Sequence, residues 1–221
     1  MKNLFRFPLA VMAVSLGLLA TSCSQDDDQD TDVIPTPSGN TEYNGQGYTI
    51  KNGFYLNGGS LSLFGGDDTH YMDYFLITDG TPTIGSNGEV NDLQNGKIAI
   101  LTPLFSAGGN SFKTGHFVYA DLSADTDLEE VELEAKYGGK SFFFQTMVMI
   151  DSDGDSNWEE EADIEITGGT IDVSGSLPNL TMSYNLQTAG GKVLKGSYSG
   201  KFTLIEGDDD GEGLKPQLSL Q

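Results

Sequence analysis

The sequence predicts an all-β fold, an antiparallel β-sandwich of about eight to ten strands. Residues 48–205 contain no long stretch with the 3.6-residue period of a helix. The 29 glycines cluster with Asn and Asp between short β-rich segments, as turns require. Because the pattern of one sequence does not reveal whether a sheet closes on itself, a lipocalin-like closed barrel stays open as the alternative.

Residues 71–77 (YMDYFLI), 97–101 (KIAIL) and 116–120 (HFVYA) are rich in β-branched and aromatic residues and predict strands. In residues 131–137 (VELEAKY), apolar residues alternate with Glu and Lys, which also predicts a strand. Residues 141–150 (SFFFQTMVMI) are apolar at nearly every position. A strand of this kind is buried on both faces, so we expect it in the centre of a sheet.

The C-terminal part predicts a hairpin. Residues 180–186 (LTMSYNL) alternate apolar and polar without a break, and Ala189-Gly190-Gly191 supplies a turn. The next segment places one set of residues on a single face: Leu194, Gly196, Tyr198, Gly200, Phe202 and Leu204. The two glycines beside Tyr198 leave room for its ring or for a facing sheet.

The N-terminus has the order of a secretory signal peptide. Lys2 and Arg6 precede the apolar run 8–20. This run is shorter than the ~20 residues that cross a bilayer as a helix, and its flanks are those of a signal peptide. We therefore expect residues 1–22 to be removed. Cys23, the only cysteine, would then begin the mature chain.

The residues around Cys23 resemble a lipobox, the site at which bacterial lipoproteins are acylated on cysteine and cleaved before it. Ala20-Thr21-Ser22-Cys23 departs from the common pattern in having Ala20 where Leu is usual. Ser24-Gln25-Asp26-Asp27-Asp28 resembles the export signal of Bacteroidota lipoproteins. The resemblance implies a lipid anchor on Cys23 and a place in the outer membrane, facing the exterior. An ordinary signal peptide with a chance cysteine is the alternative.

Acidic residues mark both ends of the expected domain. Residues 23–42 carry an aspartate run with prolines and predict a disordered tether, while residues 207–221 predict an acidic flexible tail. The β domain is expected over residues 43–206. The net charge of −22 argues against nucleic-acid binding, whose affinity comes largely from basic residues. Lipid on Cys23 would hold the protein to the membrane.

Residues 166–204 are similar to the ending of many small surface lipoproteins of the same bacteria. In that ending, a "G-T-V-T-V" strand, a "Y-T-I-x-x-x-L" strand and a "D-G-x-x-L-x-G-x-Y-x-G" strand follow each other. The present chain reads TGGTIDVSGS and then LTMSYNLQTAGGKVLKGSYSGKFTL. The resemblance implies a β-sandwich. It carries no assigned chemistry, so no functional residue is transferred.

One loop has the composition of a calcium site. Side chains with oxygen atoms recur at every second position: Asp151, Asp153, Asp155, Asn157 and Glu159. Calcium takes six to eight oxygen ligands, and Asp163 is a candidate for another. The loop is not an EF-hand, because Ser156 and Ala162 stand where that motif needs Gly and Glu. A merely acidic connection between strands is the alternative.

Trp158, the only tryptophan, lies inside this loop. It predicts either a stacking platform for a sugar ring or a side chain at the edge of the core, since its ring buries a large apolar area.

Few catalytic motifs are present. His70 and His116 are too far apart for a motif such as HExxH, and we expect His70 in an exposed turn after Gly65-Gly66-Asp67-Asp68-Thr69 rather than in a His-plus-Asp site. The G-x-S-x-G elbow is missing, since Tyr198 stands at the serine position of Gly196–Gly200. A carboxylate pair for glycoside hydrolysis stays open, because the fold decides which acids meet.

These observations predict a non-enzymatic surface lipoprotein, a binding or accessory module for a glycan, a peptide or an outer-membrane transporter. One alternative is a structural or assembly subunit of an envelope complex. The other is a small glycan hydrolase.

Overall fold

The computed structural model describes residues 37–65, 69–85, 90–154, 158 and 163–206. The described part is all-β apart from one helix. Its strands are β1 (Ser38–Tyr43), β2 (Gln46–Ile50), β3 (Asn52–Leu61), β4 (His70–Thr78), β5 (Thr81–Ile84), β6 (Val90–Gln94), β7 (Ile98–Ala107), β8 (Gly115–Tyr119), β9 (Phe142–Phe143), β10 (Met147–Ile150), β11 (Ile166–Ser176), β12 (Asn179–Thr188) and β13 (Val193–Leu204), and its helix is α1 (Glu130–Tyr137).

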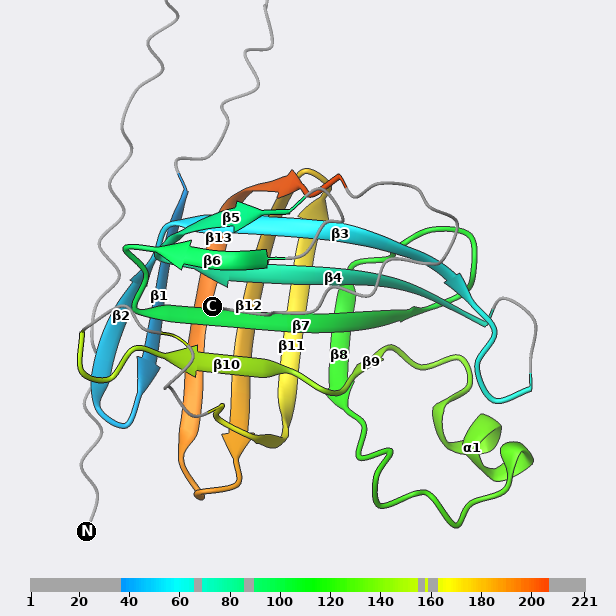
Figure 1. The fold of residues 1–221 in the computed structure, drawn as a ribbon. Helices are drawn as coiled ribbons and strands as arrows, with labels where there is room; N and C mark the ends of the chain where they lie inside the picture. Colours follow the sequence, from blue (N-terminus) through cyan, green and yellow to red (C-terminus); the bar gives the residue numbers. More distant parts are fainter. Residues whose placement is uncertain (1–36, 66–68, 86–89, 155–157, 159–162, 207–221) are drawn as a thin grey trace, which may run out of the picture. The chain divides into compact units, whose positions relative to one another are not determined.

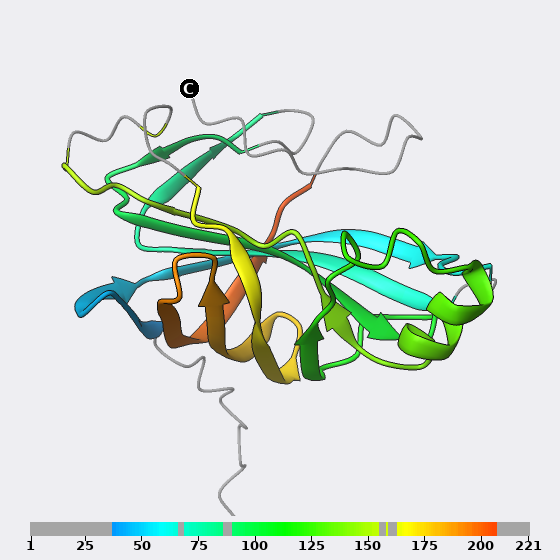
Figure 2. The same ribbon diagram turned by 90° about the horizontal axis from the view of Figure 1, so that it is seen from below.

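The strands form two layers that run across one another (Figure 1). The first layer contains β3, β4, β7 and β10, paired antiparallel in that order. The second contains β8, β11, β12, β13, β1 and β2, also antiparallel. Figure 2 shows the layers one over the other. Their facing sides enclose the main core.

Two short junctions join the layers into a closed ring of eight strands. At one side, β9 pairs antiparallel with β7 and parallel with β8. At the other, the end of β13 turns from β1 to pair parallel with β3, through Phe202, Thr203 and Leu204. The ring thus favours the closed-barrel alternative over the predicted sandwich. Single-sequence patterns missed it because both junctions join segments that are distant in the chain.

The core between the layers is closed by aromatic rings from both junctions. Phe143 of β9 and Phe202 of β13 are fully buried. The Phe202 ring packs edge-on against Phe75 of β4 and Tyr198 of β13, with centroids 5.6 and 5.1 Å apart. Burial of this kind contributes about 1.5–3 kcal/mol per large apolar side chain. It stabilises junctions that have few ladder hydrogen bonds.

The first layer is also covered on its outer face. The β5–β6 hairpin, a separate two-stranded sheet, places Val90 and Leu93 against Leu76 and Ala99. Near α1, a second outer cluster contains Met72, Phe105, Ala120, Tyr137 and Phe142. Burial on both faces explains why β7 is apolar along nearly its whole length.

The predicted strand over residues 131–137 is wrong, because this segment is helix α1. Its N-terminus has a capping box between Glu129 and Glu132, and the last turn carries Lys136. Glu, Leu, Ala and Lys are strong helix formers, and tertiary contacts of Lys136 and Tyr137 add to that preference. The alternation is therefore incidental: Val131 is 74% exposed.

The predicted strand over residues 141–150 is divided. β9 and β10 occupy its two ends, and the chain leaves the ladder between them at Gln145, whose φ is +52°. The predicted strands 71–77 and 116–120 match β4 and β8 to within one residue at each end, while 97–101 matches only the first half of β7. The C-terminal hairpin is confirmed as β12–β13, with Leu186 opposite Leu194. Only Leu204 leaves the inner face and is 44% exposed.

The folded domain begins earlier than residue 43. β1 starts at Ser38 and pairs with β13, so residues 38–42 of the predicted tether belong to the sheet. Buried and exposed side chains alternate along this strand, and Thr41 is buried. The sequence did not show this alternation because nearly all of these residues are polar. The predicted signal peptide, Cys23 and the tail over residues 207–221 lie outside the described residues.

Closure at the β3–β13 junction is testable with Gly53→Ala. A Cβ at Gly53 would lie 2.6 Å from Cε1 of Tyr198 and 3.0 Å from Cδ1 of Phe202. We expect this overpacking to lower the free energy of unfolding by about 1–3 kcal/mol, measured by urea denaturation. Gly47→Ala is the control, since a Cβ there meets nothing within 4 Å. Equal stability of the two variants would contradict tight packing at the junction.

Candidate functional site

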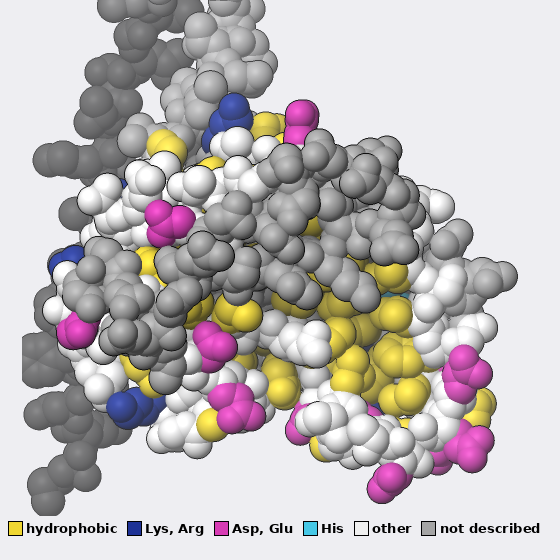
Figure 3. Space-filling view, in the orientation of Figure 1, with side chains coloured by type: hydrophobic (Ala, Val, Ile, Leu, Met, Phe, Trp, Pro, Cys, Tyr) yellow, Lys and Arg dark blue, Asp and Glu magenta, His cyan; other side chains and the backbone are white. Residues whose placement is uncertain are grey.

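An apolar groove of about 460 Å³ lies on the outer face of the first layer, beside α1. Its walls come from β4, β7, β10 and the segment before β10. The lining residues are Tyr74, Leu101, Pro103, Phe105, Phe144, Gln145 and Met147. Figure 3 shows hydrophobic side chains gathered on this face.

The groove forms where the ladder beside β7 is interrupted. β10 pairs with residues 98–101 of β7, and β9 pairs with Leu104 and Phe105. Between these pairings lies Pro103, which has no N–H to donate to a neighbouring strand. The chain opposite bulges through Gln145, which has a left-handed φ of +52°. The surface is therefore hollowed at this break. Residues with unusual backbone conformation are enriched at binding sites.

A stack of aromatic rings forms one wall of the groove. Phe144 lies 4.9 Å from Phe105, and Phe105 lies 5.1 Å from Phe142, with nearly parallel rings in both pairs. Tyr137 of α1 packs against Phe142, with centroids 5.4 Å apart. Phe144 is half-buried, so part of its ring faces the groove. A wall of this kind is rigid, which lowers the entropy lost on binding.

Polar groups are few at the groove. The amide of Gln145 is exposed at its rim. The phenol of Tyr74 is protonated at neutral pH, because its ordinary pKa is 10.0 and burial raises the pKa further. It can therefore donate a hydrogen bond. The lining therefore favours an apolar ligand group with one or two polar contacts.

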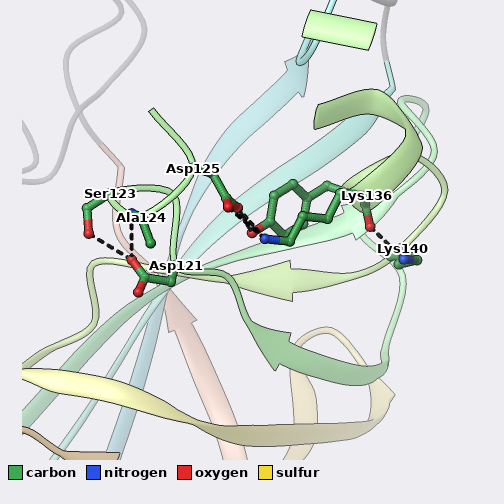
Figure 4. Close-up of polar contacts among 7 residues, drawn as sticks. Asp121, Ser123, Ala124, Asp125, Lys136 and Lys140 are labelled. Atoms are coloured by element: carbon green, nitrogen blue, oxygen red, sulfur yellow. Dashed lines mark hydrogen bonds and ion pairs between the residues drawn. The ribbon is translucent and has the colours of Figure 1, made fainter. Parts of the chain in front are cut away.

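The segment between β8 and α1 is fastened by two aspartates (Figure 4). Asp125 accepts hydrogen bonds from Nζ of Lys136, at 2.7 and 2.6 Å, and from the hydroxyl of Tyr137. The hydrogen bond from Lys136, followed by that from Tyr137, holds the pKa of Asp125 below its ordinary value. Asp121 accepts from Ser123 Oγ and from the Ala124 N–H. The contacts of Asp125 hold α1 and Tyr137 behind the aromatic wall, whereas those of Asp121 fix the turn after β8.

Of the predicted calcium ligands, the structure describes Asp151, Asp153 and Asp163. Asp155, Asn157 and Glu159 lie outside the described residues. Asp151 is buried, and its Oδ1 accepts a hydrogen bond from the Gly154 N–H at 2.6 Å. Asp153 and Asp163 are exposed. Within the described residues, no group of three His, Cys, Asp or Glu side chains is placed to hold a metal. Calcium binding stays a prediction.

Trp158 belongs to the core and is not a stacking platform. It is 1% exposed, and its Nε1–H donates to the backbone carbonyl of Leu93 at 3.1 Å. The ring packs in the outer cluster of the first layer, under the β5–β6 hairpin. Its large apolar area is removed from water, so the core alternative of the sequence analysis is confirmed.

The prediction of an exposed turn for His70 is wrong. The side chain is fully buried at the start of β4, where its Nδ1 lies 3.0 Å from Thr69 Oγ1 and its Nε2 lies 3.0 Å from the Lys140 carbonyl oxygen. His116 of β8 stands directly opposite Asp172 of β11, with Nδ1 and Oδ1 2.7 Å apart. The sequence missed this pair because only the strand register brings the two residues together.

Asp73 is a titratable group in an unusual environment. It lies on β4 with 1% exposure, on the opposite face from its groove-lining neighbour Tyr74. Burial raises the pKa of its carboxyl to about 7, although a hydrogen bond from the Gly58 backbone acts in the opposite direction. Among the described residues, no partner contacts Oδ1. A carboxyl of this kind is largely protonated below neutral pH.

Comparisons of the chain with protein-family models, with curated proteins and with solved structures found no match. Its resemblance to surface lipoproteins therefore stays a prediction. In the part of the chain that the structure describes, no helix combines the length and hydropathy that a membrane crossing requires.

The raised pKa of Asp73 predicts that the contribution of this group to folding stability falls as the pH rises from about 4 to about 7. In that window the carboxyl of the unfolded chain, with an ordinary pKa of 3.8, releases its proton while the folded protein keeps it. Asp73→Asn should therefore flatten the decline of the free energy of unfolding with pH. Above pH 7 the variant should be more stable than wild type by about 1.4 kcal/mol for each unit of the pKa shift.

Urea denaturation from pH 4 to 8 measures this difference, and Asp127→Asn controls for loss of an exposed carboxylate. Parallel stability profiles for wild type and Asp73→Asn would mean that Asp73 is not protonated in the folded protein.

Proposed function

We propose that the protein is a non-enzymatic, lipid-anchored binding module of the outer-membrane surface, and that its groove binds an apolar side chain of a partner protein. The observation that carries this proposal is the groove with its stacked Phe105–Phe144 wall. Concave, mostly apolar surfaces with a few polar groups are typical of binding sites.

The lining favours a peptide side chain over a sugar ring. A sugar presents hydroxyls around its whole edge, each of which needs a hydrogen-bond partner once water is removed. The groove offers mainly Gln145 and Tyr74 for that purpose. Phe144 and Met147 instead suit an aliphatic or aromatic anchor, since Met adapts to ligands of varied shape.

The charge of the domain indicates what should flank that anchor. The chain has 33 acidic against 11 basic residues. Glu130, Glu132 and Glu134 of α1 are exposed near this face, where Figure 3 shows acidic side chains. Basic residues beside the anchor would therefore speed association and improve specificity, with a smaller effect on affinity.

The anchor in this proposal is lipid on Cys23. The chain from Cys23 to the start of β1 at Ser38 would connect the lipid to the domain. An attachment of this kind favours encounters with neighbouring membrane proteins by raising the local concentration. An outer-membrane transporter is the partner that best suits such an accessory module.

The proposal predicts that one partner is captured through the groove. Acylated protein is purified in gentle detergent from the outer membrane of the cells that make it, and co-purified proteins are identified by mass spectrometry. Phe144→Ser removes the half-buried ring that partly faces the groove and should lower the recovered partner by about tenfold, which corresponds to about 1.4 kcal/mol. Val131→Ser, at an exposed apolar position on α1, is the matched control.

Phe144→Ser should melt below wild type, because it removes a ring stacked on Phe105. Recovery is therefore compared at a temperature at which both variants are folded, which separates loss of binding from loss of folding. Equal recovery with Phe144→Ser, or recovery of the wild-type protein alone, would contradict a role of the groove in partner binding.

Calcium is a separate proposal for the loop after β10. Asp151 already fixes a turn through Gly154, and Asp153 is exposed beside it. Calorimetry on the mature protein should show calcium binding that Asp153→Ala removes and Ser152→Ala preserves, because carboxylate oxygens are stronger calcium ligands than hydroxyls. If titration with millimolar calcium gives no heat of binding, this proposal is wrong.

A further inference from the structure

A second depression, of about 680 Å³, lies on the outer face of the second layer, at the β1–β2 hairpin. Its lining is mostly polar or glycine, in contrast to that of the groove. The residues are Asn40, Thr41, Glu42, Gly45, Gly47, Tyr48, Thr49, Lys195 and Gly196. The hairpin stands at one end of the layer in Figure 1.

Strand register gathers the exposed side chains of this depression on one face. Asn40 of β1 is opposite Thr49 of β2, and Glu42 is opposite both Gly47 of β2 and Lys195 of β13. Since successive side chains alternate between faces, these residues point to the outer side together. All of them are exposed.

Glycines hollow the surface between these side chains. Gly45 follows Asn44 in a two-residue turn, where both residues have positive φ, at +80° and +52°. Gly47 needs no such conformation, and a Cβ there would meet nothing within 4 Å. The strand therefore tolerates a side chain at position 47, and glycine leaves that volume free.

The lining can both donate and accept hydrogen bonds. Nζ of Lys195 lies 3.2 Å from Oε2 of Glu42, and the two side chains are 58% and 53% exposed. Both charged groups therefore remain accessible to a ligand. The amide of Asn40 and the hydroxyl of Thr49 each offer a donor and an acceptor. One acid and one base also balance here, although the whole chain carries a charge of −22.

We propose that this depression binds a polyhydroxylated ligand, a short stretch of neutral glycan. Sugar hydroxyls donate and accept at once, which matches an amide, a hydroxyl, a carboxylate and an ammonium group set close together. Because the charges of Glu42 and Lys195 balance at this site, its lining suits a neutral ligand better than an ion of either sign. The site lies on a different layer from the groove and does not depend on the function proposed for it.

The test fills the depression without disturbing the fold. Gly47→Phe adds a ring that suits a strand, and the Cβ that carries it would meet nothing within 4 Å. The full mature protein is first screened against immobilised oligosaccharides of glucose, mannose, xylose and galactose. The retained sugar is then titrated by calorimetry. We expect Gly47→Phe to weaken its binding by about tenfold or more, with an unchanged melting temperature.

Charge variants localise the contact further. Lys195→Met should also weaken binding, whereas Lys201→Met, an exposed position farther along β13, should not. The groove variant Phe144→Ser should bind the sugar like wild type, so failure of one site is distinguishable from failure of the other.

Two outcomes would overturn the proposal. One is that the screen retains no sugar, or retains one that Gly47→Phe binds equally well. The other is a concentration-dependent dimer of wild type, detected by sedimentation and abolished by Gly47→Phe, which would assign the hairpin to strand pairing between copies.

Discussion

Closure of the ring at two short junctions is the constraint on which the rest of this domain depends. β9 contributes two residues, and the β13–β3 pairing involves three. The few backbone hydrogen bonds at these two junctions would not by themselves hold the two crossed layers together. Phe143 and Phe202 are buried at these positions, and the hydrophobic effect there supplies most of the stabilisation. The aromatic core and the hydrogen-bonded ring therefore stabilise each other.

The junction at β9 also explains the groove. A chain that pairs with β7 at Leu104 and again at Leu101 must leave the ladder between these points. Pro103 lies at this break, where the absence of a backbone N–H is least costly. Gln145, on the chain opposite, adopts a left-handed backbone conformation. The outer aromatic wall is the continuation of the residues that close the barrel. The closure of the barrel and the groove therefore both follow from the break in the hydrogen-bonded ladder beside β7.

Local patterns predicted the parts of this fold that depend on local interactions. The β12–β13 hairpin was visible because alternation, turn and alternation follow directly in sequence. Apolar and charged residues alternate over residues 131–137, as in a strand. The capping box and the contacts with Asp125 nevertheless stabilise a helix there. The burial of His70, the pairing of His116 with Asp172 and the groove depend on strands far apart in the chain. Periodicity in one sequence contains no information on such contacts.

The last strand of the domain has three partners: β12, β1 and β3. The N-terminal hairpin joins the ring mainly through this strand. A chain that is synthesised from its N-terminus therefore cannot complete the barrel until β13, which ends at Leu204, has been made. Contacts of such long sequence separation slow folding. The order of the strands thus delays closure of the barrel until β13 is available.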